Sequence, residues 1–288
     1  MGIVLGANHY GKSETRVFRI VRDTERHVIR DLNVSTSLSG DFDAAHVVGD
    51  QGGVLPTDTQ KNTVFAFARD HGMGEIEEFA LRLARHFVDD VAPVSRADVL
   101  VQEFGWERIA DHDHGFRLTG PEIRTAEVVV DADGSQVISG VRDLVVLKST
   151  GSEFAGFLVD GFTTLAETHD RVLATSLTAR WTHADGVTAE ADHWADYWAT
   201  SYAAVKSTLL ERFVAVHSLA LQQSLWEMGR AVLEARPEVA SIELVEPNIH
   251  HVAVDLSPFG LDNPGEVFHV TDRPYGLIEV TVERDGED

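Results

Sequence analysis

Hydrophobic and polar positions along the chain follow two periods, and the segments that carry them alternate in a regular order. Strand-like segments alternate with a period of two residues, and helical segments repeat every three to four residues. In the second predicted helix, for example, Ile76, Phe79 and Leu83 fall on one stripe. The first half contains two strand-like, two helical and two more strand-like segments: residues 3–22, 26–40, 57–70, 75–91, 97–109 and 114–131.

The second half repeats this order of elements, with no claim of sequence identity between the halves. Its two strand-like, two helical and two strand-like segments are residues 136–149, 170–183, 193–216, 218–235, 241–257 and 266–284. Paired strands followed by paired helices are typical of antiparallel sheets with helices layered on one side. The pattern therefore predicts an α+β fold with two β-β-α-α-β-β units, residues 1–134 and 135–288.

The start of the first predicted helix reads VLPTDTQKNTV. Thr57 stands where an N-cap residue belongs, and Gln60 follows three positions later, which predicts a capping box. A helix N-terminus presents free N–H groups and a partial positive charge, so it favours an anion. Two interpretations stay open: the helix end is merely capped, or it holds a negatively charged ligand.

A second stretch, VEPNIHHVAVDL, lies in the predicted strand 241–257. Side chains alternate between the faces of a strand, so Asn248 and His250 are expected on one face, in line with Val252. Buried polar groups need partners, and a ligand is one kind of partner. The alternative is an Asn and a His that are satisfied within the core. His251 points the other way, which makes the adjacent histidines a poor metal chelate.

Composition narrows the classes of function. The 288 residues contain no Cys, which excludes disulfides and cysteine nucleophiles, and the formal net charge is −23. Such a charge argues against nucleic acid and anionic membranes as partners. The chain shows no signal-peptide pattern and no apolar run of about 20 residues, so a cytoplasmic protein is expected. The DHDH run at 111–114 fits a polar hairpin turn better than a zinc pattern, and no nucleotide-binding glycine motif is present.

Four further residues are candidates for chemistry, although each also has an ordinary structural interpretation. Lys12 follows a glycine near the start of a strand, where a buried amine could relay a proton. Arg171 begins a strand and Gln222 lies in the first turns of a helix. Phe154 belongs to a glycine-rich loop, STGSEFAGF. Alone, these read as a surface lysine, a surface arginine, a helical glutamine and a core aromatic residue.

Taken together, these segments resemble the urate oxidase, or uricase, family. The resemblance covers nearly the whole chain and rests on motifs in family order: YGK, TDTQKNTV, LKSTGSEFAGF, DRVLAT, LQQSLWEMG, EPNIHH and DRPYGLIE. It implies the tunnelling fold, built as two tandem units, and a homotetramer whose active sites lie between subunits. The implied reaction converts urate and dioxygen to 5-hydroxyisourate and hydrogen peroxide, as a step of purine degradation, without a metal or organic cofactor. The chain lacks the peroxisomal tail of eukaryotic members, which indicates the bacterial type.

The resemblance assigns urate-binding roles in the second half of the chain. Phe154 is expected to stack on the flat purine. Arg171 and Gln222 are expected to hold the pyrimidine side, together with the backbone N–H of Leu221. These residue types suit a planar anion that is rich in donors and acceptors, because arginine offers a planar fork and glutamine offers both a donor and an acceptor.

The resemblance also implies the groups that act on protons and oxygen. Thr57 and Asp58 are expected to reach the imidazole side of urate from a neighbouring subunit. Lys12, Thr57 and His250 form the implied proton relay. Asn248, with Thr57, is expected to hold dioxygen above the ring. One departure from the family is the Ile between Asn248 and His250, where a basic residue is often found.

Two rival functions predict different behaviour. A tunnelling-fold enzyme acting on a pterin or another purine would need a carboxylate facing the ring, and some such enzymes use a metal. A non-catalytic oligomer would bind urate without consuming oxygen. Arg171 and Gln222 as the ring-holding pair favour urate.

Overall fold

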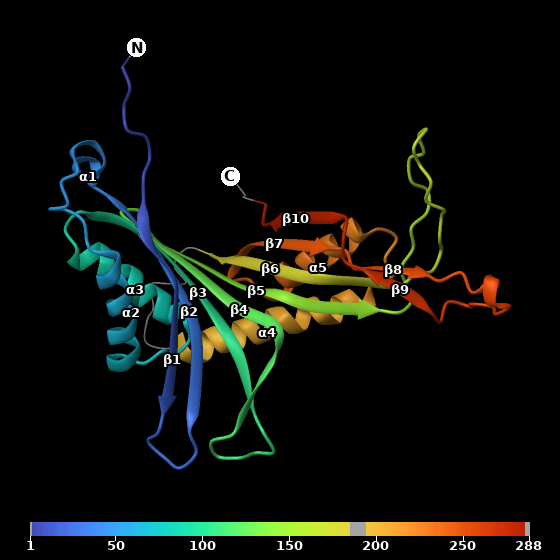
Figure 1. Ribbon diagram of the computed structural model, residues 1–288, viewed down its shortest axis with the longest axis horizontal. Helices are drawn as coiled ribbons and strands as arrows, with labels where there is room; N and C mark the ends of the chain where they lie inside the picture. The colour runs from blue at the N-terminus through green and yellow to red at the C-terminus, as the bar shows by residue number, and fades with distance from the viewer. Residues whose placement is uncertain (1, 185–193, 286–288) are drawn as a thin grey trace. The chain divides into compact units, whose positions relative to one another are not determined.

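The computed structural model describes residues 2–184 and 194–285, and the chain divides into two compact units (Figure 1). The first unit contains Met1–Gly140 and Thr182–Tyr202, and the second contains Val141–Trp181 and Ala203–Asp288. Each unit combines antiparallel strands with helices, as the order of elements predicted.

The first unit contains a four-stranded antiparallel arrangement in the order β1-β2-β3-β4. Its strands are β1 (Tyr10–Val21), β2 (Val28–Gly40), β3 (Val94–Arg108) and β4 (Phe116–Asp131). Its helices are α1 (Asp43–Val48), α2 (Thr57–Asp70) and α3 (Ile76–Asp90). Helix α2 packs on β1, and α3 packs on β3 and β4 (Figure 1).

The core of this unit lies between α3 and the strands. Ile76, Phe79 and Leu83 are each at most 1% exposed, which confirms the predicted apolar stripe. They belong to one hydrophobic cluster with the inward residues of the strands, such as Val99 and Val128. The inward face of the strands and the apolar stripe of α3 therefore pack together in one buried layer.

The second unit holds the larger part of β5 (Gly134–Lys148), β6 (Leu173–His183) and α4 (Trp194–Ala215). It also holds α5 (Leu221–Ala235), β7 (Val239–Pro247) and β10 (Leu277–Glu283). The strand order is β5-β6-β7-β10, and α5 packs on β7 and β10. Strands β8 (His250–Ala253) and β9 (Phe268–Thr271) form a separate two-stranded ladder, and a 3₁₀ turn spans Ser257–Phe259.

Three predictions of elements were wrong in detail. The strand expected over 3–22 begins at Tyr10, and the short helix α1 was not predicted. The strand expected over 241–257 ends at Pro247 and resumes at His250. The last predicted strand, 266–284, is likewise split into β9 and β10, with Pro274 in the intervening turn. Proline carries no N–H for a ladder, which explains why both breaks fall beside one.

The DHDH run forms the turn between β3 and β4, as predicted. Arg26 pairs with Asp111 and Asp113 of this turn, and the rings of His112 and His114 meet edge to face with centroids 4.4 Å apart. Within residues 2–184 and 194–285, no helix is long and apolar enough to cross a bilayer. In the same ranges, no group of three histidine or acidic side chains is placed to hold a metal ion.

Candidate active site

Lys12 lies in the first unit at a distorted point of β1. It is half-buried and pairs directly with Thr36 of β2, and the register shifts between Lys12 and Thr15. Glu14, inside this bulge, has a φ of 57°. The strands approach closely here, because a Cβ on Gly11 would lie 1.8 Å from the carbonyl oxygen of Thr36. The glycine of the YGK motif therefore permits the contact that places Lys12.

Thr57 and Asp58 form the exposed first turn of α2. The predicted capping box is wrong: Pro56 is the N-cap residue, Thr57 is the first helical residue, and no side chain caps the helix. The first backbone bond of the helix runs from the N–H of Gln60 to the carbonyl of Pro56, at 3.1 Å. The N–H groups of the three residues before Gln60 therefore have no acceptor within the helix, as expected at a helix start.

The side chain of Asp58 is directed back along α2 rather than away from it. Its carboxylate accepts hydrogen bonds from Lys61 and, at 2.9 Å, from Asn62. The bond from Lys61 is the main cause that lowers the pKa of Asp58, and the charge of Lys12 contributes to the same shift. Lys12, Thr57 and Asp58 therefore belong to one locality of the first unit, which we call the relay half-site.

Phe154 and Arg171 meet in the second unit. The guanidinium carbon of Arg171 lies 5.2 Å from the centroid of the Phe154 ring. The backbone N–H of Arg171 donates to the carbonyl of Ser152 at 2.8 Å, and Phe154 and Thr168 exchange backbone bonds of 2.8 and 2.9 Å. Burial lowers the pKa of Arg171, but an arginine stays a cation in proteins. A flat cation beside an aromatic ring is an arrangement that suits a flat anion.

The start of α5 joins the same locality through the backbone. Ser152 forms a bridge with Ser218, and the N–H of Glu153 donates to the carbonyl of Ser218 at 2.7 Å. Three residues after Ser218, Leu221 opens α5 as a buried residue, followed by the exposed Gln222. Phe154, Arg171 and the first turn of α5 are thus held by main-chain bonds around Ser152. We call this group the clamp half-site.

Asn248 and His250 lie on either side of the break between β7 and β8. They are not on one continuous strand, so their common face stays a prediction. The expected buried row is wrong at Val252, which is 55% exposed. Asn248 bridges to Thr175, and its N–H donates to the carbonyl of Gly276 at 2.9 Å. Since Thr175 follows Arg171 by four residues, Asn248 is tied to the chain segment that leaves the clamp half-site.

Comparison with known proteins decides the family. The chain matches the family described as Uricase over residues 8–129 and 137–279. The chain belongs to the uricase family. It is 51% identical to the uricase of Arthrobacter globiformis over 284 residues, which cover 99% of this chain and 91% of that protein. It is 36% identical to the uricase of Oryctolagus cuniculus over 287 residues, covering 96% and 93%.

Solved structures of uricases share the fold. The crystal structure of the Arthrobacter globiformis uricase superposes with a TM-score of 0.93 at 50% identity, covering all of this chain and 97% of that one. The Bacillus sp. TB-90 urate oxidase matches with a TM-score of 0.80 at 22% identity, covering 96% and 100%. The predicted α+β tunnelling fold and the bacterial type of uricase are thereby confirmed. The predicted enzyme class, urate oxidase, follows from the same family membership.

Two carboxylates of this uricase-family chain were missed by sequence reasoning. Glu153 accepts from His217 at 2.6 Å and contacts His169 at 3.3 Å, and these bonds, that of His217 first, lower the pKa of Glu153. Both histidines flank residues of the clamp half-site in sequence, His169 before Arg171 and His217 before Ser218. Proximity in sequence to two separate motifs was the available signal, but it does not reveal that the three side chains meet.

The second missed carboxylate, Glu246, is fully buried beside Lys148. Neither of its oxygens has a hydrogen-bond partner among the described residues. Burial raises the pKa of Glu246 to about 8, and the charge of Lys148 opposes that shift. Lys148 donates to the carbonyl of Val216 at 2.7 Å, and burial lowers the pKa of this lysine. Glu246 follows Leu244 by two residues on β7, so the two side chains share a face, and this spacing was the signal for the burial of Glu246.

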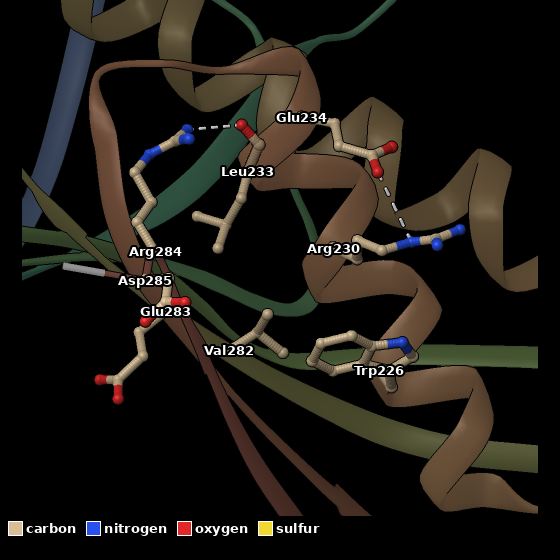
Figure 2. Close-up of a pocket in the computed structure, with 8 residues that line it drawn as sticks. All are labelled: Trp226, Arg230, Leu233, Glu234, Val282, Glu283, Arg284 and Asp285. Atoms are coloured by element: carbon tan, nitrogen blue, oxygen red, sulfur yellow. Dashed lines mark hydrogen bonds and ion pairs between the residues drawn. The ribbon is translucent and has the colours of Figure 1, made fainter. Parts of the chain in front are cut away.

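An open hollow of about 560 Å³ lies between α5 and β10 (Figure 2), and none of its lining residues is a predicted site residue. Its lining residues are Trp226, Arg230, Leu233, Glu234, Val282, Glu283, Arg284 and Asp285. Arg230 pairs with Glu234 at 3.6 Å, and Arg284 donates to the carbonyl of Leu233 at 2.5 Å, as the dashed lines show. Arg230, Glu234 and Arg284 of the hollow thus already contact partners within the chain.

Proposed function

We propose that this urate oxidase binds urate at the clamp half-site and moves protons through the relay half-site together with His250. The observation that carries the proposal is the meeting of Phe154 and Arg171, 5.2 Å apart and held by main-chain bonds to Ser152 and Thr168. Phe154 stacks on the purine ring, which adds about 0.5–1.5 kcal/mol beyond burial. Arg171, Gln222 and the N–H of Leu221 bind the pyrimidine edge.

The reaction balances as urate, dioxygen and water giving 5-hydroxyisourate and hydrogen peroxide. Urate loses two electrons and two protons, and dioxygen accepts them to become hydrogen peroxide. The oxygen of water enters 5-hydroxyisourate. Deprotonated urate is itself the electron donor, so we expect turnover without a metal or organic cofactor. The chain's residues would then orient urate and remove its protons. Lys12, Thr57 and His250 carry the relay, and Asn248, with Thr57, holds dioxygen.

The two half-sites belong to separate units, and each lacks what the other supplies. The relay half-site offers an amine, a hydroxyl and free helix N–H groups, and the clamp half-site offers the ring and the guanidinium. We propose that Thr57 and Asp58 of one chain meet the clamp half-site of a neighbouring chain, in a homotetramer of tandem units 1–134 and 135–288. The exposure of Thr57 and Asp58 supports this arrangement. The open first turn of α2 then faces the anionic ligand.

One assay tests the reaction. Protein treated with a chelator is mixed with urate while urate absorbance, oxygen uptake and peroxide are followed together. We expect equal molar changes of all three that are insensitive to the chelator. Urate binding without oxygen uptake would identify a non-catalytic binder, and loss of turnover after chelation would contradict a cofactor-free reaction.

The clamp assignment is tested by Arg171→Ala. Charge-assisted hydrogen bonds contribute about 1.5–3 kcal/mol, so we expect the affinity for urate to fall roughly 10- to 100-fold. Arg180→Ala is the matched control, because Arg180 lies on β6 and pairs with Glu243 instead. Titration of urate under nitrogen measures binding without turnover. Unchanged affinity in Arg171→Ala would reject the clamp role.

A further inference from the structure

We propose that Gln60 is a positioning residue, which holds the first turn of α2 at a fixed distance from Lys12 through the hydroxyl of Thr36. This inference rests on the proposed roles of Lys12 and Thr57. Gln60 is 0% exposed and Thr36 is 4% exposed, so both side chains lie inside the layer between α2 and the strands. The Oγ1 of Thr36 and the Oε1 of Gln60 are 2.7 Å apart.

Thr36 is the link because it faces both partners. It pairs directly with Lys12 across β1 and β2, and directly paired residues project to the same face of a sheet. The backbone N–H of Lys12 donates to the Oγ1 of Thr36 at 3.4 Å. A hydroxyl has one proton, and the 2.7 Å contact with Gln60 is shorter than the 3.5 Å contact with the carbonyl of Lys12. The Thr36 proton is therefore assigned to Gln60.

Packing alone would favour an apolar residue at position 60. Gln60, Val64 and Ala68 are the buried residues of α2, spaced four residues apart on one stripe. The Nε2 of Gln60 is buried and has no partner among the described side chains and backbone. Leaving a buried donor unsatisfied costs about 1–3 kcal/mol. A leucine would avoid this cost, so the glutamine is better explained by what its Oε1 holds than by stability.

Lys12 needs such a tether because its own strand is irregular. The ladder between β1 and β2 is interrupted directly after Lys12, and the N–H of Glu14 donates to the Oγ of Ser35 at 2.9 Å instead of to the backbone. Side-chain hydrogen bonds therefore hold the backbone of β1 both at the edge of the bulge, at Lys12, and inside it, at Glu14. Thr57 lies three residues before Gln60, so a bond at Gln60 fixes the turn that carries Thr57 and Asp58.

Two isosteric substitutions test the tether. Gln60→Leu removes the acceptor and Thr36→Val removes the donor, with little change in volume. We expect each to lower kcat about 10-fold or more, since small displacements of reacting groups cost that much or more. KM should change less than threefold and the pH profile of kcat should shift. The unfolding temperature of Gln60→Leu should stay equal or rise, because its unpartnered buried amide is removed. That of Thr36→Val should fall, because the buried Oε1 of Gln60 loses its donor.

A conservative variant and a double variant separate positioning from packing. Thr36→Ser keeps the hydroxyl and should retain kcat within twofold. The double variant Thr36→Val with Gln60→Leu should be no slower than either single variant, since both break one link. Wild-type kcat in Gln60→Leu, or a kcat of Gln60→Leu that falls only together with its unfolding temperature, would overturn the proposal.

The same experiment distinguishes failure of the tether from failure of the relay. Lys12→Ala should lower turnover far more than it weakens urate binding. If Lys12→Ala is slow and Gln60→Leu is not, the tether is wrong and the relay stands. If Lys12→Ala is as fast as the wild type, the relay assignment itself is wrong.

Discussion

The surroundings of each side chain decide the chemistry of the two carboxylates Glu153 and Glu246. Glu153 lies between two imidazoles near the surface, and its hydrogen bonds stabilise the charged form and lower its pKa. Glu246 is fully buried near the charge of Lys148, and burial raises its pKa to about 8. Both groups are carboxyls, but hydrogen bonds stabilise the charged form of Glu153 and burial stabilises the neutral form of Glu246.

Glu246 should give the protein a pH-dependent stability. Its pKa rises from 4.5 to about 8 on folding, so between these values the folded state holds a proton that the unfolded chain releases. The free energy of unfolding therefore falls as pH rises through this window, by up to about 1.4 kcal/mol per unit. Glu246→Gln should lack this slope and gain stability relative to the wild type at pH 8 and above.

Urea unfolding from pH 5 to pH 9 measures the effect. Glu243→Gln is the control, because Glu243 lies on the other face of β7 and is more exposed than Glu246. It should keep the slope of the wild type. Curves for Glu246→Gln and the wild type that run parallel over the whole range would contradict the prediction.

At the scale of elements, α5 and the strands beneath it are in unusually close contact. A Cβ on Gly229 would lie 2.6 Å from a methyl carbon of Val282 and 3.3 Å from one of Ile242. The helix therefore approaches β10 and β7 as far as a glycine allows. Gly229 serves packing here, since it lies inside α5 where glycine is otherwise unfavourable.

Gly229→Ala should destabilise the protein despite the better helix propensity of alanine. Overpacking costs about 1–3 kcal/mol, and propensity returns about 1 kcal/mol, so a net loss of roughly 1 kcal/mol is expected from the unfolding midpoint. Adding Val282→Ala should recover stability relative to the sum of the two single changes. Additive losses would show that the contact with Val282 is not the cause.

Sequence periodicity predicted the elements well where one face of an element is buried. The bounds of α2 were predicted correctly, and the stripe of α3 was found as expected. The breaks in the last two predicted strands were missed because alternation continues across them, while Pro247 and Pro274 end the ladders. Gln60 was read as part of a cap because local spacing suggests one, whereas a tertiary contact with Thr36 takes its side chain.

At the scale of the whole molecule, the assembly proposed above makes activity a property shared between chains. Motifs in family order were sufficient to predict the family, the fold and the reaction. They were not sufficient to place residues such as Lys12 relative to Arg171, because order along a chain carries no information about which chain supplies each group.

Mixing two inactive variants tests the shared site. Lys12→Ala damages the relay half-site and Arg171→Ala damages the clamp half-site. If every site takes one half from each of two chains, random co-assembly of equal amounts leaves about a quarter of the sites with both halves intact. Co-expressed variants should thus regain up to about a quarter of wild-type turnover. Activity no higher than that of the separate variants would place each site within one chain.

The frame around Ser152 consists of main-chain bonds, and this has a consequence for how the enzyme could change over evolutionary time. Hydrogen bonds between main-chain atoms form whatever side chain the residue carries. Replacement of Phe154 or Arg171 therefore leaves intact the backbone that presents their side chains. New substrate preferences could then arise there by single substitutions, without rebuilding the surrounding loops.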